Sequence, residues 1–344
     1  MKRSDIWWRI PEIKQGSRVL DLGAGGPAIP NKIDTRSVTY LTSDLRRFRE
    51  ADLAGHHHAT KLIRDVEEKG PYDIVLYEPP QREAKQRIFE LIDGAFKSLG
   101  VGGRLYLAAR KDRGASSYRD RISVVFGNVA LVGRAKRMRV FEAHKTGTEP
   151  GEPSVNPWTS FELTLPGGRS LPFKARAGVF SADEFDPGSR FLVETIDSLV
   201  SGRILDFGCG AGTIGISLAA NHPQVELTMV DVNALATQCA QENTCKNGLE
   251  SRATVLTVDG YDTLAGQTFD WIASNPPFHE GNAVAHPLIE GAPGHLEPGG
   301  KLALVVMRVE PYVKAIERVF RHFKVLATDD HYTVVLAEEP WGTA

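Results

Sequence analysis

The fold is decided by the stretch Ile204-Leu205-Asp206-Phe207-Gly208-Cys209-Gly210-Ala211-Gly212, in which a short apolar run passes directly into glycines. The pattern predicts a buried strand, a tight turn and the start of a helix, because glycine lets the backbone approach a ligand and lets the helix pack closely on the sheet. A turn that binds the pyrophosphate of a dinucleotide has the spacing G-x-G-x-x-G. Here the glycines stand two residues apart, which favours a site for a nucleoside joined to methionine.

Acidic residues stand at the ends of the next two apolar runs. Residues 225–230 lead into Asp231, and a carboxylate about 20 residues after such a turn can accept hydrogen bonds from both ribose hydroxyls. Its alternative role is to cap the helix that begins near Asn233. Residues 254–258 lead into Asp259, which can accept from the adenine amino group or can be an ordinary loop residue. We therefore predict a cofactor site that includes Asp231 and Asp259.

The chemistry is indicated by Asn275-Pro276-Pro277-Phe278, which follows an apolar run over 269–274. An exocyclic amine is a poor nucleophile, because its lone pair is delocalised. The Asn275 side-chain carbonyl and the Pro276 backbone carbonyl can each accept one N–H, which turns the nitrogen toward the methyl donor. The prolines stiffen the turn, and Phe278 offers a stacking face to a planar substrate. The glycine turn followed by this tetrapeptide resembles the layout of methyltransferases that modify exocyclic or amide nitrogens, and this resemblance implies methyl transfer to such a nitrogen.

With this tetrapeptide and the glycine turn, the chain resembles the ribosomal RNA guanine-N2 methyltransferases of the RsmC/RlmG type, which are class I S-adenosylmethionine-dependent methyltransferases. Residues 178–181 and 185–192 are similar to the segment that leads into that family's catalytic domain, and residues 279–281 to its usual continuation. Where many relatives have a small residue and Asn, this chain has Val306-Met307-Arg308. The resemblance implies methyl transfer from S-adenosylmethionine to the N2 amine of a guanine in ribosomal RNA, with the small subunit favoured.

The candidate site residues come from the motifs and from the resemblance together. The catalytic candidates are Asn275, Pro276, Pro277 and Phe278. The cofactor-binding candidates are Asp206, Gly208, Gly210, Asp231, Asp259 and Asn275.

The first half of the chain repeats the second half in four features that keep their order. In the first half these features are Asp21 with its glycines, Asp44, Glu78-Pro79-Pro80 and the segment 99–105. Four ordered matches predict two tandem domains of one fold. We expect an α/β protein with two Rossmann-like methyltransferase domains, each a seven-stranded, mostly parallel sheet with helices on both faces. The expected divisions are a degenerate methyltransferase-like domain over 1–145, a linker and hairpin over 146–175, and a catalytic domain over 176–344.

The two copies differ where the chemistry would take place. Glu78 replaces the catalytic Asn, and Gln81 replaces the aromatic residue. We expect no catalysis in the first domain, chiefly because the stacking ring is lost. The sequence leaves open whether that domain still binds the cofactor, since Asp21, Gly23 and Asp44 are retained.

The net charge of -2 conceals an uneven distribution. Residues 1–149 contain 28 Lys and Arg against 19 Asp and Glu, whereas residues 150–344 contain 13 against 24. Because phosphate contacts require cations, we expect the basic first half to bind ribosomal RNA or a ribosomal subunit. Each basic cluster taken alone is more often a solvated face. The clusters are Arg46, Arg47 and Arg49; Arg110, Lys111 and Arg113; Arg119 and Arg121; and Arg134, Lys136, Arg137 and Arg139.

Composition limits the remaining classes of protein. No run approaches the roughly 20 apolar residues of a membrane helix, and the first residues show no export signal. The three cysteines, Cys209, Cys239 and Cys245, lack metal-ligand spacing and indicate a reducing compartment. The run 56–58 of three histidines is expected to be an exposed loop. We therefore expect a cytoplasmic protein without a membrane partner or a metal.

Two other readings remain open. The same tetrapeptide serves adenine-N6 methylation of nucleic acid and glutamine methylation of proteins, although Tyr is more frequent at the aromatic position in those families. The chain can also be a non-catalytic RNA-binding factor in ribosome assembly, since one copy has already lost its catalytic residues. The sequence does not identify the guanine, the form of RNA that is bound or the oligomeric state.

Overall fold

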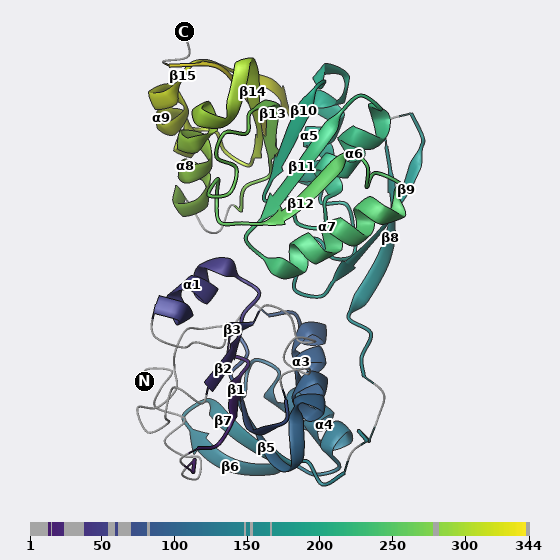
Figure 1. Ribbon diagram of the computed structural model, residues 1–344, viewed down its shortest axis with the longest axis vertical. Coiled ribbons are helices and arrows are strands. Elements are labelled where there is room, and N and C mark those ends of the chain that lie inside the picture. The colour runs from purple at the N-terminus through teal and green to yellow at the C-terminus, as the bar shows by residue number, and fades with distance from the viewer. Residues whose placement is uncertain are drawn as a thin grey trace. The chain divides into compact units, whose positions relative to one another are not determined.

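The computed structural model divides into two compact units, Met1–Pro157 and Trp158–Ala344 (Figure 1). Each unit contains one seven-stranded sheet, and a two-stranded hairpin belongs to the second unit. Among the described residues, no helix combines the length and the apolar character that a membrane span requires. The structure describes residues 13–14, 16–23, 38–53, 59–60, 70–80, 83–147, 149–151, 154–165, 167–277 and 282–341.

The second unit alternates strands with helices after its hairpin, which is typical of a doubly wound sheet. Its strands are β8 (Trp158–Thr164), β9 (Ser170–Arg176), β10 (Arg203–Phe207), β11 (Glu226–Asp231), β12 (Ala253–Thr257), β13 (Phe269–Ser274), β14 (Leu296–Val306), β15 (Phe320–Thr328) and β16 (Thr333–Pro340). Its α-helices are α5 (Pro187–Ile196), α6 (Thr213–Asn221), α7 (Ala234–Lys246), α8 (Asn282–Gly291) and α9 (Glu310–Val319).

The strand order of this sheet is β12-β11-β10-β13-β14-β16-β15, and among these described strands β16 alone runs in the direction opposite to the other six. The chain moves outward from β10 to β12 and then returns to place β13 on the other side of β10. In sheets of this kind, ligands bind at the carboxyl ends of the strands where the order reverses. The fold therefore brings the glycine turn after β10 and the tetrapeptide after β13 to the same edge.

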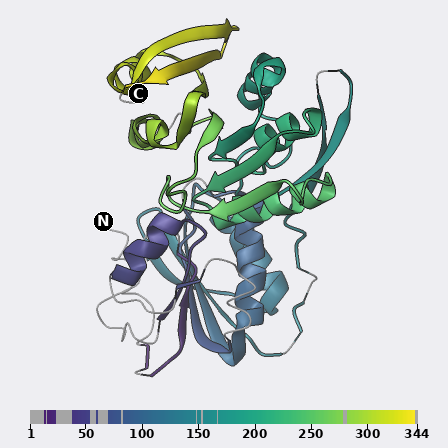
Figure 2. The ribbon, with the colours of Figure 1, turned by 45° about the horizontal axis from the view of Figure 1, so that its top comes forward.

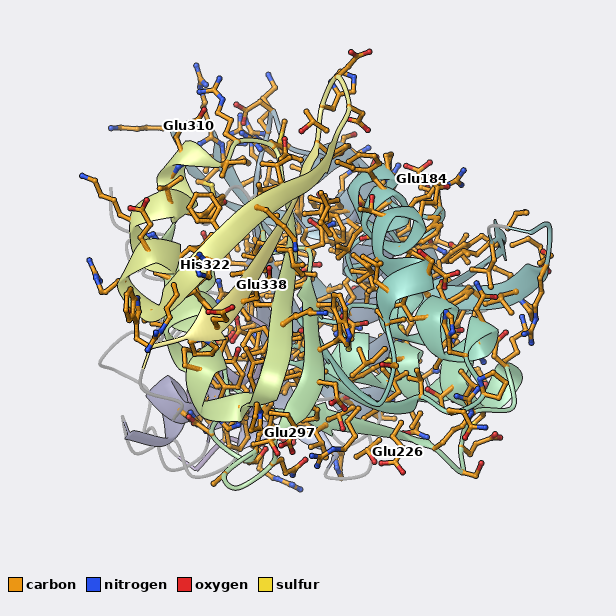
Figure 3. All side chains as sticks on the ribbon, turned by 90° about the horizontal axis from the view of Figure 1, so that it is seen from above. Glu184, Glu226, Glu297, Glu310, His322 and Glu338 are labelled. Carbon is orange, nitrogen blue, oxygen red and sulfur yellow. The ribbon has the colours of Figure 1, made fainter. Side chains whose placement is uncertain are left out.

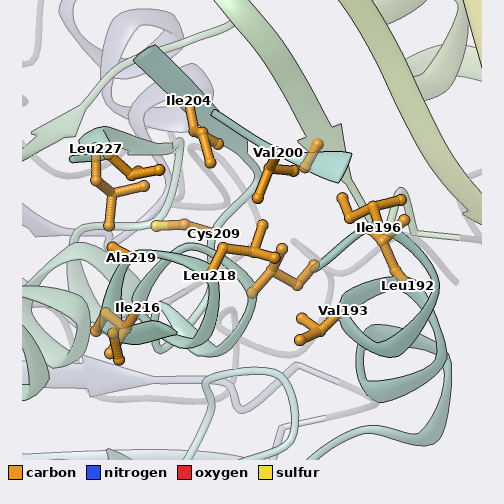
Figure 4. Close-up of a cluster of buried hydrophobic side chains, with 14 of the residues drawn as sticks. Leu192, Val193, Ile196, Val200, Ile204, Cys209, Ile216, Leu218, Ala219 and Leu227 are labelled. Atoms are coloured by element: carbon orange, nitrogen blue, oxygen red, sulfur yellow. The ribbon is translucent and has the colours of Figure 1, made fainter. Parts of the chain in front are cut away.

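Alternate side chains of the central strands enter two apolar layers, one on each face of the sheet. Ile204 of β10 and Trp271 of β13 lie in the layer to which α5, α6 and α7 contribute. Figure 4 shows Ile204 in this layer with side chains of α5 and α6. Their neighbours Leu205 and Ile272 lie in the layer to which α8 and α9 contribute. Helices thus cover both faces, so the predicted fold class is confirmed.

The hairpin predicted over 158–175 forms from β8 and β9 and lies against α7 (Figures 1 and 2). The Asn243 side chain of α7 accepts a hydrogen bond from the Lys174 N–H and donates one to the Lys174 carbonyl, both at 2.8 Å. Leu163 and Phe173 are fully buried in the same layer as α5, α6 and α7. The hairpin is therefore part of the core of the second unit, whereas the sequence grouped it with the linker.

The first unit contains the same sheet, with the order β3-β2-β1-β4-β5-β7-β6. Its strands are β1 (Val19–Asp21), β2 (Val38–Leu41), β3 (Ala59–Thr60), β4 (Tyr72–Tyr77), β5 (Leu99–Arg110), β6 (Ala130–Ala135) and β7 (Met138–His144). Its described α-helices are α1 (Leu45–Leu53), α3 (Lys85–Ser98) and α4 (Ala115–Phe126).

Strand register confirms the duplication that the sequence predicts. Asp21 of β1 pairs with Leu76 of β4, and Asp206 of β10 pairs with Ala273 of β13. Glu78 and Asn275 each stand two residues beyond those partners, so they occupy equivalent positions in the two copies.

Candidate active site

The turn after β10 has three glycines with positive φ, a conformation that other residues rarely adopt. The φ values are 74° at Gly208, 55° at Gly210 and 84° at Gly212. The Gly208 N–H donates to the Val230 carbonyl at 2.8 Å, which ties the turn to the end of β11. A Cβ atom on Gly212 would come within 2.8 Å of Cδ1 of Ile216. The turn therefore presents bare backbone at the carboxyl edge of the sheet.

Asp206 is fully buried beneath this turn. Its Oδ2 accepts a hydrogen bond from the Gly215 N–H of α6 at 2.8 Å, whereas its buried Oδ1 has no hydrogen-bond partner among the described residues. Burial, and then the nearby charge of Asp231, raises the pKa of Asp206 to about 7 against the opposing effect of the Gly215 hydrogen bond. An N–H or ammonium group of a ligand would satisfy the free oxygen, so the site fits the methionine end of the expected cofactor.

The raised pKa of Asp206 gives the first testable prediction. The carboxyl titrates near pH 7 in the folded protein but near 3.8 in the unfolded chain, so the folded state binds an extra proton between these values. The free energy of unfolding should therefore fall as pH rises through this window. Asp206→Asn removes the charge and should gain several degrees of melting temperature relative to wild type between pH 5 and pH 8. A difference in melting temperature that stays constant across this range would contradict the assignment.

The side chain of Asp231, at the end of β11, holds the glycine turn and the residue before α7 in place. Its Oδ2 accepts from the Gly210 N–H at 2.9 Å, and its Oδ1 accepts from the Asn233 N–H at 2.8 Å. The side chain of Asn233 caps α7 by accepting from the Leu235 N–H. The capping role that the sequence offered as an alternative for Asp231 therefore belongs to Asn233, and Asp231 is fixed and partly exposed beside the glycines.

Asp259 lies two residues beyond β12 and is partly exposed. The Val258 N–H donates to the Asp231 backbone carbonyl at 3.0 Å, which joins the ends of β12 and β11. Tyr261 anchors the following loop, because its ring packs 4.8 Å from that of Phe207 and its hydroxyl donates to a backbone carbonyl of α8. Asp206, Asp231 and Asp259 thus lie at or just beyond the carboxyl ends of three adjacent strands.

The tetrapeptide after β13 is held by contacts on both sides. The Ser274 hydroxyl donates to the Phe207 carbonyl at 2.7 Å, which fixes the end of β13 to the end of β10. Nδ2 of Asn275 donates to Oδ1 of Asp186 at 2.7 Å and to Oγ of Ser189 at 2.9 Å. The amide nitrogen is therefore occupied, and the side-chain carbonyl remains as the acceptor that Asn275 can offer to a substrate.

Comparison with known proteins decides the family. The model of the methyltransferase small domain matches residues 9–142 and 170–336, which include most of both units. The chain is 31% identical to the ribosomal RNA small subunit methyltransferase C of Pasteurella multocida over 92% of each chain. It is 32% identical to that of Vibrio parahaemolyticus over 98% of each chain. The chain belongs to this family of RsmC-type methyltransferases.

The similarity extends to a solved structure of an RsmC-type enzyme. That structure is the 16S rRNA N2 methyltransferase (RsmC) of T. thermophilus in complex with AdoMet and guanosine. The TM-score is 0.84 at 28% sequence identity, and the match covers 98% of this chain and 92% of that one. The predicted family is confirmed, and S-adenosylmethionine is confirmed as the cofactor of the family.

Some predicted residues of this RsmC-type protein lie outside the described part of the chain. They include Phe278, residues 279–281 and, in the first half, residues 56–58 and Gln81. Within the described part, no three His, Cys, Asp or Glu side chains gather closely enough to hold a metal ion.

Three residues at the RsmC-type site were not predicted as site residues. Ser274 aligns the two strand ends, and Asp186 and Ser189 hold Asn275. Two local signals cover Asp186 and Ser189: the similarity of residues 185–192 to the family's lead-in segment, and the Asp-Pro pair at 186–187, which is typical of a helix start. Neither signal indicates a partner 89 residues away.

By strand register, the first copy of the RsmC-type fold has Thr42 where the second copy has Asp231, because Asp21 pairs with Tyr40 as Asp206 pairs with Met229. Asp44 then corresponds to Asn233, so the match of Asp44 with Asp231 that the sequence predicted is wrong.

Both carboxylate oxygens of Asp44 accept from the guanidinium of Arg46, at 3.1 and 2.8 Å. Burial acts to raise the pKa of Asp44, but the hydrogen bonds and charge of Arg46 lower it overall. Asp44, like Asn233, accepts the backbone N–H two residues further on at the start of the next helix. The first copy therefore has a threonine in place of the carboxylate that would accept from the ribose.

Proposed function

We propose that this protein transfers a methyl group from S-adenosylmethionine to the N2 amine of a guanine in small-subunit ribosomal RNA. The observation that carries the proposal is the Asn275 side chain, whose nitrogen is bound to Asp186 and Ser189 and whose carbonyl is left to accept a substrate N–H. It follows β13 at the edge where the glycine turn follows β10.

Each group in this site has a defined task in the proposed reaction. When bound, S-adenosylmethionine supplies a methyl group on a sulfonium. The carbonyls of Asn275 and Pro276 accept the two N–H groups of the amine and point its lone pair at the methyl carbon. As the N–C bond forms and the S–C bond breaks, positive charge grows on the nitrogen, and both carbonyl dipoles stabilise it. The nitrogen then loses one proton to water, so no strong base is required.

The relatives support a guanine in small-subunit RNA as the substrate. The T. thermophilus neighbour holds guanosine, and its target is guanine 1207 of 16S rRNA. The curated relatives are small subunit methyltransferases. We propose the equivalent guanine as the target of this chain.

We propose that the basic first unit binds the RNA. Seven cations gather where β5 ends and where β6 turns into β7, with Asp112 as the only acid in these two segments. The Lys111 N–H donates to the Arg137 carbonyl at 2.7 Å and joins the two segments. The second unit lacks this excess, and Figure 3 shows glutamates on several of its elements, among them Glu226 on β11, Glu310 on α9 and Glu338 on β16. The seven cations, named here the β5–β7 cluster, are Arg110, Lys111, Arg113, Arg134, Lys136, Arg137 and Arg139.

Neutralising the β5–β7 cluster should weaken RNA binding. Lys111, Lys136 and Arg137 are exposed, and we expect their joint replacement by Ala to lower affinity by about tenfold or more at moderate salt. The slope of log K against log salt should become shallower by about 2 to 3, since each of the three lost phosphate contacts releases roughly 0.7 to 0.9 counterion fewer. Filter binding of 16S rRNA across a salt series measures both quantities.

The matched control replaces three exposed cations of the second unit, Lys314, Arg318 and Arg321, by Ala. We expect this variant to keep the wild-type salt slope. An equal loss of RNA affinity in both variants would show that the position of the cations does not matter, and it would contradict a specific RNA-binding role for the β5–β7 cluster.

The proposed function is tested by offering labelled S-adenosylmethionine together with isolated small subunits, isolated large subunits, free 16S rRNA and a mixture of ribosomal proteins. We expect label in small subunits or 16S rRNA, and none in large subunits or protein. Label confined to large subunits or to protein would contradict the proposed substrate.

A further inference from the structure

We propose that Asp186 and Ser189 are positioning residues, which fix the orientation of the Asn275 amide so that its carbonyl always faces the substrate. The inference rests on the proposed function and deepens it, because it explains how an amide with two chemically different ends is made to present only one of them.

The first step of the argument is the rigidity of Asp186. It is the N-cap of α5, and its Oδ1 accepts from the Ser189 N–H at 2.7 Å. Pro187 occupies the first turn of the helix, where its fixed φ favours the helical start. A Cβ atom on Gly188 would come within 2.9 Å of Cε1 of Tyr332, so this turn packs closely against the ring. The carboxylate is therefore held by the helix itself.

The second step is chemical. A carboxylate accepts hydrogen bonds and donates none. The same Oδ1 of Asp186 that caps the helix also accepts from Nδ2 of Asn275 at 2.7 Å, and Oγ of the buried Ser189 accepts the second N–H at 2.9 Å. A flipped amide would place its oxygen against the carboxylate oxygen and lose both hydrogen bonds. Only one orientation of the Asn275 side chain is therefore compatible with this helix end.

The third step concerns the substrate. If the Asn275 amide could flip, its NH2 group would face the substrate amine in one orientation and its carbonyl in the other. Only the second orientation can accept an N–H of the amine. Locking the amide presents a permanent acceptor, which prepares the site before the substrate arrives. The arrangement also selects against a base that has an acceptor in place of the amine, because two acceptors would then face each other.

Asp186→Ala and Ser189→Ala test the proposal, with the rate of methyl transfer and the cofactor Kd measured for each. We expect Asp186→Ala to lower kcat on the order of 100-fold and Ser189→Ala on the order of tenfold, with cofactor Kd within about twofold of wild type. Asp186→Asn retains an Oδ1 that can accept from both partners, and we expect it to keep kcat within about threefold of wild type.

Asp197→Ala is the matched control. Asp197 lies at the other end of α5, and its carboxylate also accepts from the side-chain amide of an asparagine, Asn221, at 3.1 Å. We expect wild-type kcat for this variant. A kcat for Asp186→Ala within threefold of wild type would overturn the proposal. An Asp186→Asn variant as slow as Asp186→Ala would also overturn it, because the role of Asp186 would then depend on its charge. A loss of cofactor binding in Asp186→Ala that matches the loss of kcat would overturn it too, because the effect would then lie in folding of the site.

A second readout does not depend on the substrate. In nitrogen-15 NMR spectra, we expect the two Asn275 side-chain amide protons to be shifted and slow to exchange in wild type and in Asp186→Asn. In Asp186→Ala we expect these two protons to lose their shift and to exchange quickly with solvent. If wild type methylates no RNA, the proposed function fails, whereas unchanged Asn275 amide signals in Asp186→Ala would overturn the positioning role alone.

Discussion

Asn275→Ala is expected to lower kcat by about 100- to 1,000-fold, because it removes a fixed acceptor from the nitrogen on which charge develops. The effect should fall on kcat, since the side chain acts on the amine and not on the bulk of the RNA. The cofactor Kd should change by less than about threefold, because Asp231 and the glycine turn remain intact. This expectation sets aside the cofactor-binding role that the sequence also offered for Asn275, whose described side-chain hydrogen bonds go to Asp186 and Ser189. Initial rates with saturating RNA and calorimetric titration of S-adenosylmethionine measure the two quantities.

The matched control for this change is Asn247→Ala. Nδ2 of Asn247 donates to two backbone carbonyls, those of Pro172 and Asn243, and so has a structural contact pattern similar to that of Asn275. We expect Asn247→Ala to cost stability and to leave kcat unchanged. An Asn275→Ala enzyme that retains wild-type kcat would show that the tetrapeptide is not the catalytic element.

Asp231→Ala should have the second large effect, on cofactor binding. The carboxylate is proposed to accept from the ribose hydroxyls, and it also holds the Gly210 and Asn233 N–H groups that shape the turn. Its removal should weaken S-adenosylmethionine binding on the order of 100-fold, since both direct contacts and the shape of the site are lost. Calorimetry or equilibrium dialysis of the folded variant measures this change.

Asp270→Ala is the control for Asp231. Asp270 also accepts a backbone N–H, that of Arg203 at 2.7 Å, but it lies at the opposite end of β13 from the site. We expect its cofactor Kd to match wild type once both proteins are shown to be folded. If both variants bind S-adenosylmethionine equally weakly, the effect of Asp231→Ala would come from lower protein stability and not from lost contacts with the cofactor.

The fold could be predicted because its signals are local and repeated. An apolar run with glycines that begin two residues after Asp206 predicts β10, its turn and α6, and the same pattern around Asp21 predicts the other copy of the fold, in the first unit. The alternation of Ile204 and Leu205 between two apolar layers follows from strand geometry once both faces carry helices.

The support of the site could not be predicted from the sequence. The contact between Asp186 and Asn275 depends on packing of α5 against the sheet, which no pattern around either residue encodes. The correspondence of Asp44 was mistaken for a similar reason, because only the strand register shows that it matches Asn233 and that Thr42 matches Asp231. The hairpin was recognised from its turn, but its place in the core depends on Asn243 of a distant helix.

The most direct test of the central claim is the chemical identity of the methylated product. Small subunits or 16S rRNA that lack the modification are incubated with S-adenosylmethionine and either wild type or Asn275→Ala, and the digested nucleosides are resolved by mass spectrometry and chromatography. We expect N2-methylguanosine with wild type and at least 100-fold less at equal times with the variant. N6-methyladenosine, or N2-methylguanosine formed equally by both proteins, would contradict the account.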